Sequence, residues 1–435
     1  MNAPRRELVL DGFALALLKL AIGAWILHEG FTHVSDDDYA RTVISEQFAH
    51  APRLDPSGTS WLPFPFWIEG AAMMALGRTL GVARAMAMAV GAASVAAPYL
   101  AMRAVGTRRA VALAATAVAM TTPWNAWLGV ATVPEGWIGA IVAAALIVMP
   151  LESARPLAAV GLAVGSLARY ETWPACGAMA ALCVWHATRS GNVRRELAWA
   201  GVALAGPLAW MVWNAHAHDG PFHFVTRVTT FRQAIGAAAV PLADKLAGYP
   251  RALASEAPVA ALLGLAGLIF LRRPEARARW GWPAAAALGI LVFLVWGDVH
   301  DGAPTHHAAR ALVAVTWVLI AMGVDATFAL SEHLRVRPAM RIPVTYGAVA
   351  VSVLIAGAAV LGWSAYPGST EAEQRGPQIA RGLDLRARHV AAATITPCSF
   401  EHFALLAAWG EPERSTVLAR TGAPPTPACP LVEER

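Results

Sequence analysis

The chain carries a series of apolar segments long enough to cross a lipid bilayer, and this feature restricts its fold more than any other. An α-helix rises about 1.5 Å per residue, so about 20 mostly apolar residues span the hydrocarbon core. Only 14% of the 435 residues are charged, against about a quarter in soluble domains. The sequence therefore predicts an all-α polytopic membrane protein with about eleven transmembrane helices. The candidate spans are residues 9–28, 85–104, 109–128, 134–151, 156–170, 171–187, 196–214, 257–271, 281–297, 309–329 and 342–362.

The arginines indicate the orientation of these spans, because short loops rich in Lys and Arg stay in the cytoplasm. If Arg5 and Arg6 lie inside and the short apolar stretch 64–76 does not cross, every compact basic cluster is cytoplasmic. If 64–76 crossed, those clusters would lie outside. Asp11 and Lys19 interrupt the first apolar stretch, which argues against a cleaved signal peptide. We expect a bacterial inner-membrane protein with a cytoplasmic N-terminus and an extracytoplasmic tail.

The long polar segments all lie on the outer side in this arrangement. We divide the chain into a transmembrane part, residues 1–362, with a first outer loop at 29–84, and a small extracytoplasmic segment, residues 363–435. This segment is expected to form a small α/β or irregular cap on the membrane part. Its two cysteines, Cys398 and Cys429, would pair in an oxidising compartment, but two cysteines alone leave the bridge open.

Three consecutive carboxylates follow the first expected span. Asp36, Asp37 and Asp38 begin an amphipathic stretch that continues with Tyr39 and Arg41. Neighbouring carboxylates repel one another and favour a proton or a cation between them, so one of them is a candidate general base or metal ligand. The alternative is structural, because acidic residues also cap helix N-termini. One Asp would suffice for a cap, so we favour catalysis by this cluster, with Tyr39 and Arg41 contacting substrate.

Four further charged residues lie at the outer ends of expected spans. Glu135 begins the fourth span at the level of the aspartates, although acids at helix N-termini are also common for electrostatic reasons. Arg169 and Glu171 interrupt an apolar run at an expected turn, 169–174, either as a functional site or as an ion pair that caps a hairpin. Arg169 and Arg310 have the planar guanidinium that binds phosphate well. We expect all four residues to contact substrate.

Other patterns restrict the class of function. The Pro-aromatic stretch Trp61–Trp67 suits either a membrane interface or contact with a lipid substrate. The loop 298–310 is rich in Asp and His, but its spacing matches no closed zinc site. The sequence has no glycine-rich phosphate loop, GxSxG motif or HExxH motif, which argues against an enzyme that uses a nucleotide. Because the arginines act as topology signals, we expect no nucleic-acid partner.

Taken together, these features resemble the membrane glycosyltransferases of the protein O-mannosyltransferase and aminoarabinose transferase type, which have the GT-C fold. The resemblance covers roughly residues 10–330 and rests first on the acidic motif Asp36–Arg41 in the first outer loop. The Pro-aromatic stretch Trp61–Trp67 before a non-spanning helix, the carboxylate Glu135 and the turn Arg169–Glu171 also fit. The tail resembles no family that we can name.

The resemblance implies a specific reaction. A sugar on polyprenyl monophosphate is transferred to an acceptor hydroxyl with inversion, and a first-loop aspartate is the base, with Asp37 favoured among the three. Arg169 and Arg310 match loosely the positions of basic residues near the donor phosphate. Some relatives need a divalent metal ion and others do not, so Glu135 as a metal ligand stays open. The sugar and the acceptor are unknown, and membrane lipids are the other expected partners.

Two alternatives belong to other classes of function. A transporter or flippase for a lipid-linked or anionic substrate needs charged residues near the bilayer midplane and often has repeated halves. Asp11, Lys19 and Asp325 lie instead near the ends of spans, and the sequence has no internal repeat. A non-catalytic scaffold that presents the tail is the third possibility. Replacement of the first-loop aspartates would abolish a transferase and leave a scaffold working.

Overall fold

The structure, a computed structural model, describes residues 5–234, 240–302, 307–333, 369–420 and 429–434. The expected span 342–362 lies outside these residues. The helices of the first part are α1 (Arg5–His28), α2 (Asp36–His50), α3 (Phe64–Leu76), α4 (Leu80–Ser94), α5 (Ala96–Ala104), α6 (Arg109–Thr121), α7 (Pro123–Trp127), α8 (Glu135–Val148), α9 (Arg155–Ser166), α10 (Trp173–Ser190), α11 (Val193–Ala217), α12 (His223–Ala234), α13 (Leu242–Glu256), α14 (Pro258–Phe270), α15 (Pro274–Val299), α16 (Ala308–Ala311) and α17 (Val313–His333).

Proline begins many of these helices, because its missing N–H costs nothing in the first helical turn. It occupies that turn in α3, α7, α9, α10, α14 and α15. Short 3-10 helices at Glu152–Ala154 and Tyr170–Thr172 connect neighbouring helices. The second of them separates α9 from α10, so the expected turn at 169–174 is confirmed.

Among the described residues, five helical segments are long and apolar enough to cross a membrane: α1, α11, α15, α17, and α4 and α5 counted as one segment, Leu80–Ala104. A sixth span is possible if α13 and α14, which meet at a bend of 102°, are counted together. Four of the five long helices bury only 33% of their apolar window, whereas α17 buries 72% and lies inside the bundle. The exposed apolar faces of the outer helices are what a lipid environment requires. The polytopic all-α membrane fold is confirmed.

Several expected spans are shorter than the sequence suggests. The stretch 109–128 is divided into α6 and α7, and α8 has 14 residues, of which 11 are buried. The helix α3, which was expected not to cross, has 13 residues, or about 20 Å of length, against roughly 30 Å of hydrocarbon. Short helices of this kind satisfy their ends through contacts with neighbours. The total of eleven spans stays a prediction.

The end of the chain folds into a small α/β unit, which we call the cap. It consists of α19 (Ser369–Ala387), β1 (Ala393–Thr396), α20 (His402–Trp409), the 3-10 helix Pro412–Arg414, β2 (Ser415–Val417) and β3 (Leu431–Glu434). The strands form one sheet in the order β2-β1-β3, in which β1 pairs in parallel with β2 and antiparallel with β3. Cys398 and Cys429 form a disulfide, and Cys176 and Cys183 are free and buried.

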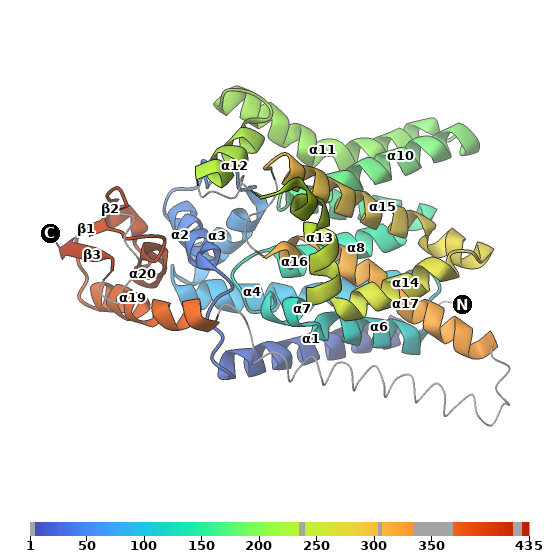
Figure 1. The fold of residues 1–435 in the computed structure, drawn as a ribbon, viewed down its shortest axis with the longest axis horizontal. Coiled ribbons are helices and arrows are strands. Elements are labelled where there is room, and N and C mark those ends of the chain that lie inside the picture. Colours follow the sequence, from blue (N-terminus) through green and yellow to red (C-terminus); the bar gives the residue numbers. More distant parts are fainter. Residues whose placement is uncertain (1–4, 235–239, 303–306, 334–368, 421–428, 435) are drawn as a thin grey trace.

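The cap packs on the first outer loop. Figure 1 shows α2 and α3 between the cap and the helix bundle, with the N-terminus at the far end of the bundle. Tyr39 and Val43 of α2 are buried in one hydrophobic cluster with Leu385 and Trp409 of the cap. The helix that carries the three aspartates is therefore held from one side by residues more than 300 positions away in the sequence.

Candidate active site

A cavity of about 1180 Å³ opens where α2, the turn between α9 and α10, the helices α12, α15 and α16, and the cap meet. Seven of the sequence-predicted site residues line it: Asp36, Asp37, Arg41, Glu135, Arg169, Glu171 and Arg310. Asp38 and Tyr39 are not among its lining residues. Much of the remaining wall is apolar and aromatic, which suits a substrate with an apolar portion. Its aromatic members include Trp61, Trp173, Phe222, Phe224, Phe231, Phe293, Trp296, Phe400 and Phe403.

The three aspartates diverge because each residue of an α-helix is rotated by about 100° from the one before it. Asp36 forms a two-point ion pair with Arg375 of the cap, with Nε–Oδ1 and Nη2–Oδ2 distances of 2.7 and 2.8 Å. Asp37 Oδ2 lies 3.2 Å from Nη1 of Arg310, and its side chain is 35% exposed. Asp38 is fully buried. Each carboxylate therefore has a different environment, although the sequence makes them look equivalent.

Asp38 is held by the backbone. Its Oδ2 accepts hydrogen bonds from the N–H groups of Val34 and Ser35, at 3.2 and 3.3 Å, and its Oδ1 accepts from Thr132 N–H at 3.0 Å. Burial raises the pKa of Asp38, and these backbone N–H groups and Arg84 oppose the rise. Asp38 thus caps α2 and ties it to the segment before α8, which is the structural alternative considered for the cluster.

Tyr39 also lies away from the cavity. Its ring is buried in the cluster shared with the cap, and its hydroxyl lies 3.2 Å from Nδ1 of His33. The structure gives Tyr39 a packing role between α2 and the cap, and no contact with the cavity.

Glu135 is the centre of a chain of ion pairs. Its Oε1 lies 2.7 Å from Nη2 of Arg310 and 2.8 Å from Nη1 of Arg169. Arg169 Nε in turn contacts Glu171 at 2.7 Å, and Arg310 reaches Asp37 on the other side. The start of α8, the turn after α9 and the short helix α16 thereby bring together four charged groups that are widely spaced in the sequence.

Arg41 differs from the other buried arginines of the cavity. Among the described residues none forms an ion pair with it, and its Nε and Nη1 have no hydrogen-bond partner. Its guanidinium carbon lies 4.6 Å from the Trp61 ring centre and 5.5 Å from that of Phe66. Burial lowers the pKa of Arg41, and the Glu135 carboxylate acts in the opposite direction. A buried guanidinium without a partner is an expensive arrangement that an anion would relieve.

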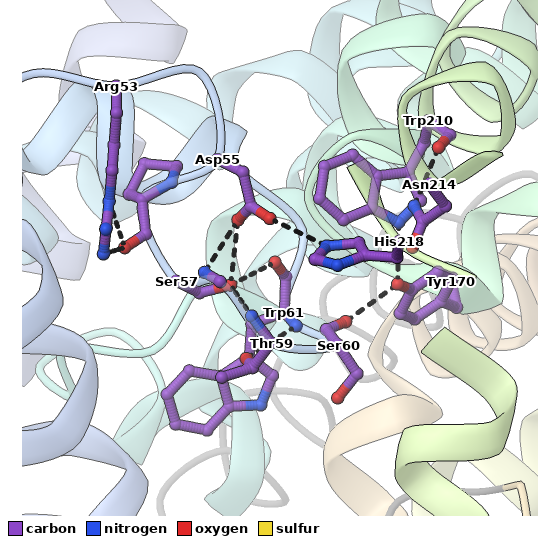
Figure 2. A network of polar contacts seen from close by, with 12 residues as sticks. Arg53, Asp55, Ser57, Thr59, Ser60, Trp61, Tyr170, Trp210, Asn214 and His218 are labelled. Carbon is purple, nitrogen blue, oxygen red and sulfur yellow. Dashed lines mark hydrogen bonds and ion pairs between the residues drawn. The ribbon is translucent and has the colours of Figure 1, made fainter. Parts of the chain in front are cut away.

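A network of hydrogen bonds holds Trp61 beneath this guanidinium (Figure 2). Asp55 Oδ1 accepts a hydrogen bond from Gly58 N–H, and the Ser57 hydroxyl, with one hydrogen to donate, lies 3.2 Å from Asp55 Oδ1 and 3.0 Å from the Trp61 carbonyl oxygen. On the other side Asp55 Oδ2 lies 3.6 Å from Nε2 of His218, at the end of α11. The loop before α3 is therefore fixed both internally and to the bundle, and with it the surface on which Arg41 rests.

The carboxylates of the cavity do not fit a divalent metal ion. Asp37 and Glu135 are the pair that would share a cation, and the guanidinium of Arg310 already bridges them. The only group of three potential ligands among the described residues is Cys398, Glu401 and Cys429, and its two cysteines are consumed by the disulfide.

The Asp- and His-rich loop 298–310 is organised by ion pairs. Asp298 pairs with Arg232 at 2.8 Å, and Asp301 pairs with Lys245 at 2.7 Å. These contacts join α12 and α13 to the end of α15. In the described part of this loop, both carboxylates pair with cationic side chains of the chain.

Sequence reasoning missed the contribution of the cap to this cavity. Arg375, Ser399, Phe400 and Phe403 line it, although they follow the last expected span. Arg375 has no local pattern that marks it, because its partner Asp36 is 339 positions away. The sequence also did not indicate that aromatic residues of α12 and α15 would line the cavity, since such residues are common in membrane helices.

The fold is similar to that of a solved protein, in the crystal structure of ArnT from Cupriavidus metallidurans bound to undecaprenyl phosphate. The TM-score is 0.58, the sequence identity is 12%, and the match covers 96% of this chain and 87% of that chain. No family model matches the sequence, and no curated protein matches it. At this identity the similarity establishes the fold: the chain is a polytopic membrane protein with the GT-C fold, as the resemblance of its motifs led us to expect.

Proposed function

We propose that this chain is an integral membrane glycosyltransferase that moves a sugar from a polyprenyl-phosphate donor to an acceptor hydroxyl, with inversion. One observation carries the proposal: a single cavity with aromatic walls contains both a partly exposed carboxylate, Asp37, and a buried arginine, Arg41, that has no ion-pair partner among the described residues. These are the groups that a hydroxyl nucleophile and a phosphate leaving group require. The similarity to ArnT, whose structure holds undecaprenyl phosphate, supports a donor of the same class.

Asp37 is the base in this proposal, because the other two aspartates are occupied. Both oxygens of Asp36 accept from Arg375, and both oxygens of Asp38 accept from backbone N–H groups. Asp37 has one contact, at 3.2 Å to Arg310, and faces the cavity with 35% of its side chain exposed. It therefore keeps lone pairs free for a proton.

The reaction balances without a cofactor. The acceptor oxygen forms a bond to the anomeric carbon while the bond from that carbon to the phosphate oxygen breaks, and the acceptor proton passes to Asp37. The polyprenyl phosphate leaves as a monoester with one more negative charge than it had in the donor. Arg41 stabilises that charge, and Arg310 and Arg169 contribute from the ion-pair chain. Glu135 and Glu171 affect the substrate indirectly, because they orient these arginines.

The proposed cellular location rests on the topology expected from the sequence. We propose the bacterial inner membrane, with the N-terminus in the cytoplasm and the cap outside. The cavity lies beside the cap, at the end of the bundle far from the N-terminus (Figure 1), so the sugar reaches the aqueous side while the prenyl chain stays in the bilayer. The disulfide of the cap supports an oxidising compartment on this side.

The test is transfer from labelled polyprenyl-phosphate sugars by the purified protein in lipid, with wild type, Asp37→Asn and a matched control. Asp244→Asn is the control, because Asp244 also has one arginine partner, Arg251, at 3.4 Å, but lies outside the cavity. We expect transfer by wild type and the control, and a loss of about 100-fold or more in Asp37→Asn. Full activity in Asp37→Asn would refute the assigned base. Absence of both transfer and donor binding in wild type would refute the transferase itself.

A further inference from the structure

Arg375 is the one charged residue that the cap contributes to the cavity wall among the residues the structure describes. Its side chain is 5% exposed, and it grips Asp36 with two parallel contacts at 2.7 and 2.8 Å. This fork-to-fork geometry fixes the direction of both side chains as well as their separation. The pair therefore places the charge of Asp36 toward the cap, next to the residue that we assign as the base.

Other contacts also attach the cap to the first outer loop. Tyr39 and Val43 share its hydrophobic cluster, and Nη1 of Arg78 contacts both carboxylate oxygens of Glu413, at 2.8 and 2.7 Å, outside the cavity. Arg386 donates a hydrogen bond to the Arg78 carbonyl at 2.8 Å. With these contacts in place, a buried arginine aimed at Asp36 is better explained by the site than by cap attachment.

The charges of the acidic turn explain why such a group is required. Asp36 and Asp37 are consecutive, and Arg310 Nη1 lies 3.2 Å from both Asp37 Oδ2 and the Ser35 hydroxyl. Without Arg375, the carboxylate of Asp36 would be unpaired and next in sequence to Asp37, whose partner is the guanidinium of Arg310. It would compete for Arg310 and repel the charge on Asp37.

We propose that Arg375 is a positioning residue of the site: it takes up the charge of Asp36, so that, of these two aspartates, only Asp37 contacts Arg310 and stays available to the substrate. This inference rests on the proposed transferase function. The cap is then a working part of the active site, completed when the last residues of the chain fold onto the first outer loop.

The test compares Arg375→Gln, Asp36→Asn and the double variant in the donor-transfer assay. If Arg375 serves to balance Asp36, Arg375→Gln lowers kcat by about tenfold or more with little change in KM for the donor. The double variant, in which both charges are gone, recovers most of the wild-type rate. A double variant as slow as Arg375→Gln overturns the proposal, because the arginine would then act on something other than Asp36.

A control separates this role from cap attachment. Arg78→Gln removes another arginine–carboxylate contact of the cap, outside the cavity, and the resistance of the cap to limited proteolysis reports docking in every variant. We expect Arg78→Gln to loosen the cap at least as much as Arg375→Gln does, with a smaller loss of kcat. Equal losses of kcat in the two variants would show that Arg375 only helps to dock the cap. Neither result resembles failure of the transferase itself, in which wild type transfers no sugar.

Discussion

Arg41→Gln is expected to weaken donor use without destabilising the protein, which is an unusual combination for a buried arginine. Removal of one partner from a buried ion pair normally costs about 3–5 kcal/mol, because the other charge is left uncompensated. Arg41 has no such partner among the described residues. Its substitution removes a desolvated charge, which is stabilising, and also removes the contact with the Trp61 ring, which is destabilising by roughly 0.5–2 kcal/mol. These two terms oppose each other, so the unfolding free energy should change by less than about 1 kcal/mol.

The effect on transfer is larger. A charge-assisted hydrogen bond contributes about 1.5–3 kcal/mol, which corresponds to roughly a tenfold to 150-fold change in an equilibrium or rate constant. If Arg41 binds the donor phosphate before and during transfer, kcat/KM falls by this factor. Arg41→Lys should recover part of the loss, because it keeps the charge and loses the planar fork.

The assay measures transfer as a function of donor concentration, together with heat denaturation of the purified protein. Arg155→Gln is the matched control, because Arg155 is 2% exposed and pairs with Glu196 at 2.6 Å, outside the cavity. The control should lose stability and keep its KM for the donor, the reverse of Arg41→Gln. An Arg41→Gln protein that is clearly less stable than wild type but has an unchanged kcat/KM would refute the reasoning.

Three further predictions concern the metal requirement, the stability and the pH dependence of the protein. Because Arg310 bridges Asp37 and Glu135, transfer should be unaffected by a chelator; activity that is lost with EDTA and restored by Mn²⁺ would contradict this. Glu135→Gln removes the carboxylate that two buried arginines share and leaves them only Asp37 and Glu171, so heat denaturation should show a loss of at most about 3–5 kcal/mol; unchanged stability would be the opposing result. Burial raises the pKa of Glu69 from 4.5 to about 8. The unfolded chain therefore releases this proton first as the pH rises, and stability falls between about pH 4.5 and 8. Glu69→Gln should match wild type near pH 4 and exceed it at pH 8 by up to about 5 kcal/mol; a difference independent of pH would count against this assignment.

The membrane fold was predictable because its cause is local in the sequence. Apolar runs identify α1, α11, α15 and α17 within a few residues, and Pro134 and Glu135 mark the start of α8. The division of 109–128 at Thr122 was not predicted, although Pro123 marks the break by starting α7. Inside a bundle, a short helix satisfies its ends through neighbours, so hydropathy alone does not show where it stops.

The candidate site was only partly predictable, for a geometric reason. Charged residues at the outer ends of spans are visible in the sequence, and Asp37, Glu135, Arg169 and Arg310 do meet in one cavity. Their pairing was not visible, because it depends on which helix ends lie side by side. The different fates of the three aspartates follow from helical rotation and from partners that are distant in sequence. Arg375 was missed because nothing in the tail marks it.

The balance of charge in the cavity bears on the mechanism that we propose. Five arginines (Arg41, Arg169, Arg227, Arg310 and Arg375) and four carboxylates (Asp36, Asp37, Glu135 and Glu171) line the cavity, so the set carries one net positive charge before the donor arrives. In the proposed transfer Asp37 gains a proton and loses its charge, while the departing phosphate gains one. A negative charge thus moves from the Arg310 side of the cavity toward Arg41, and the total charge stays constant. A low-dielectric site penalises any net change of charge, and this exchange makes none. Arg41 can receive the new charge directly, because among the described residues no carboxylate forms an ion pair with it.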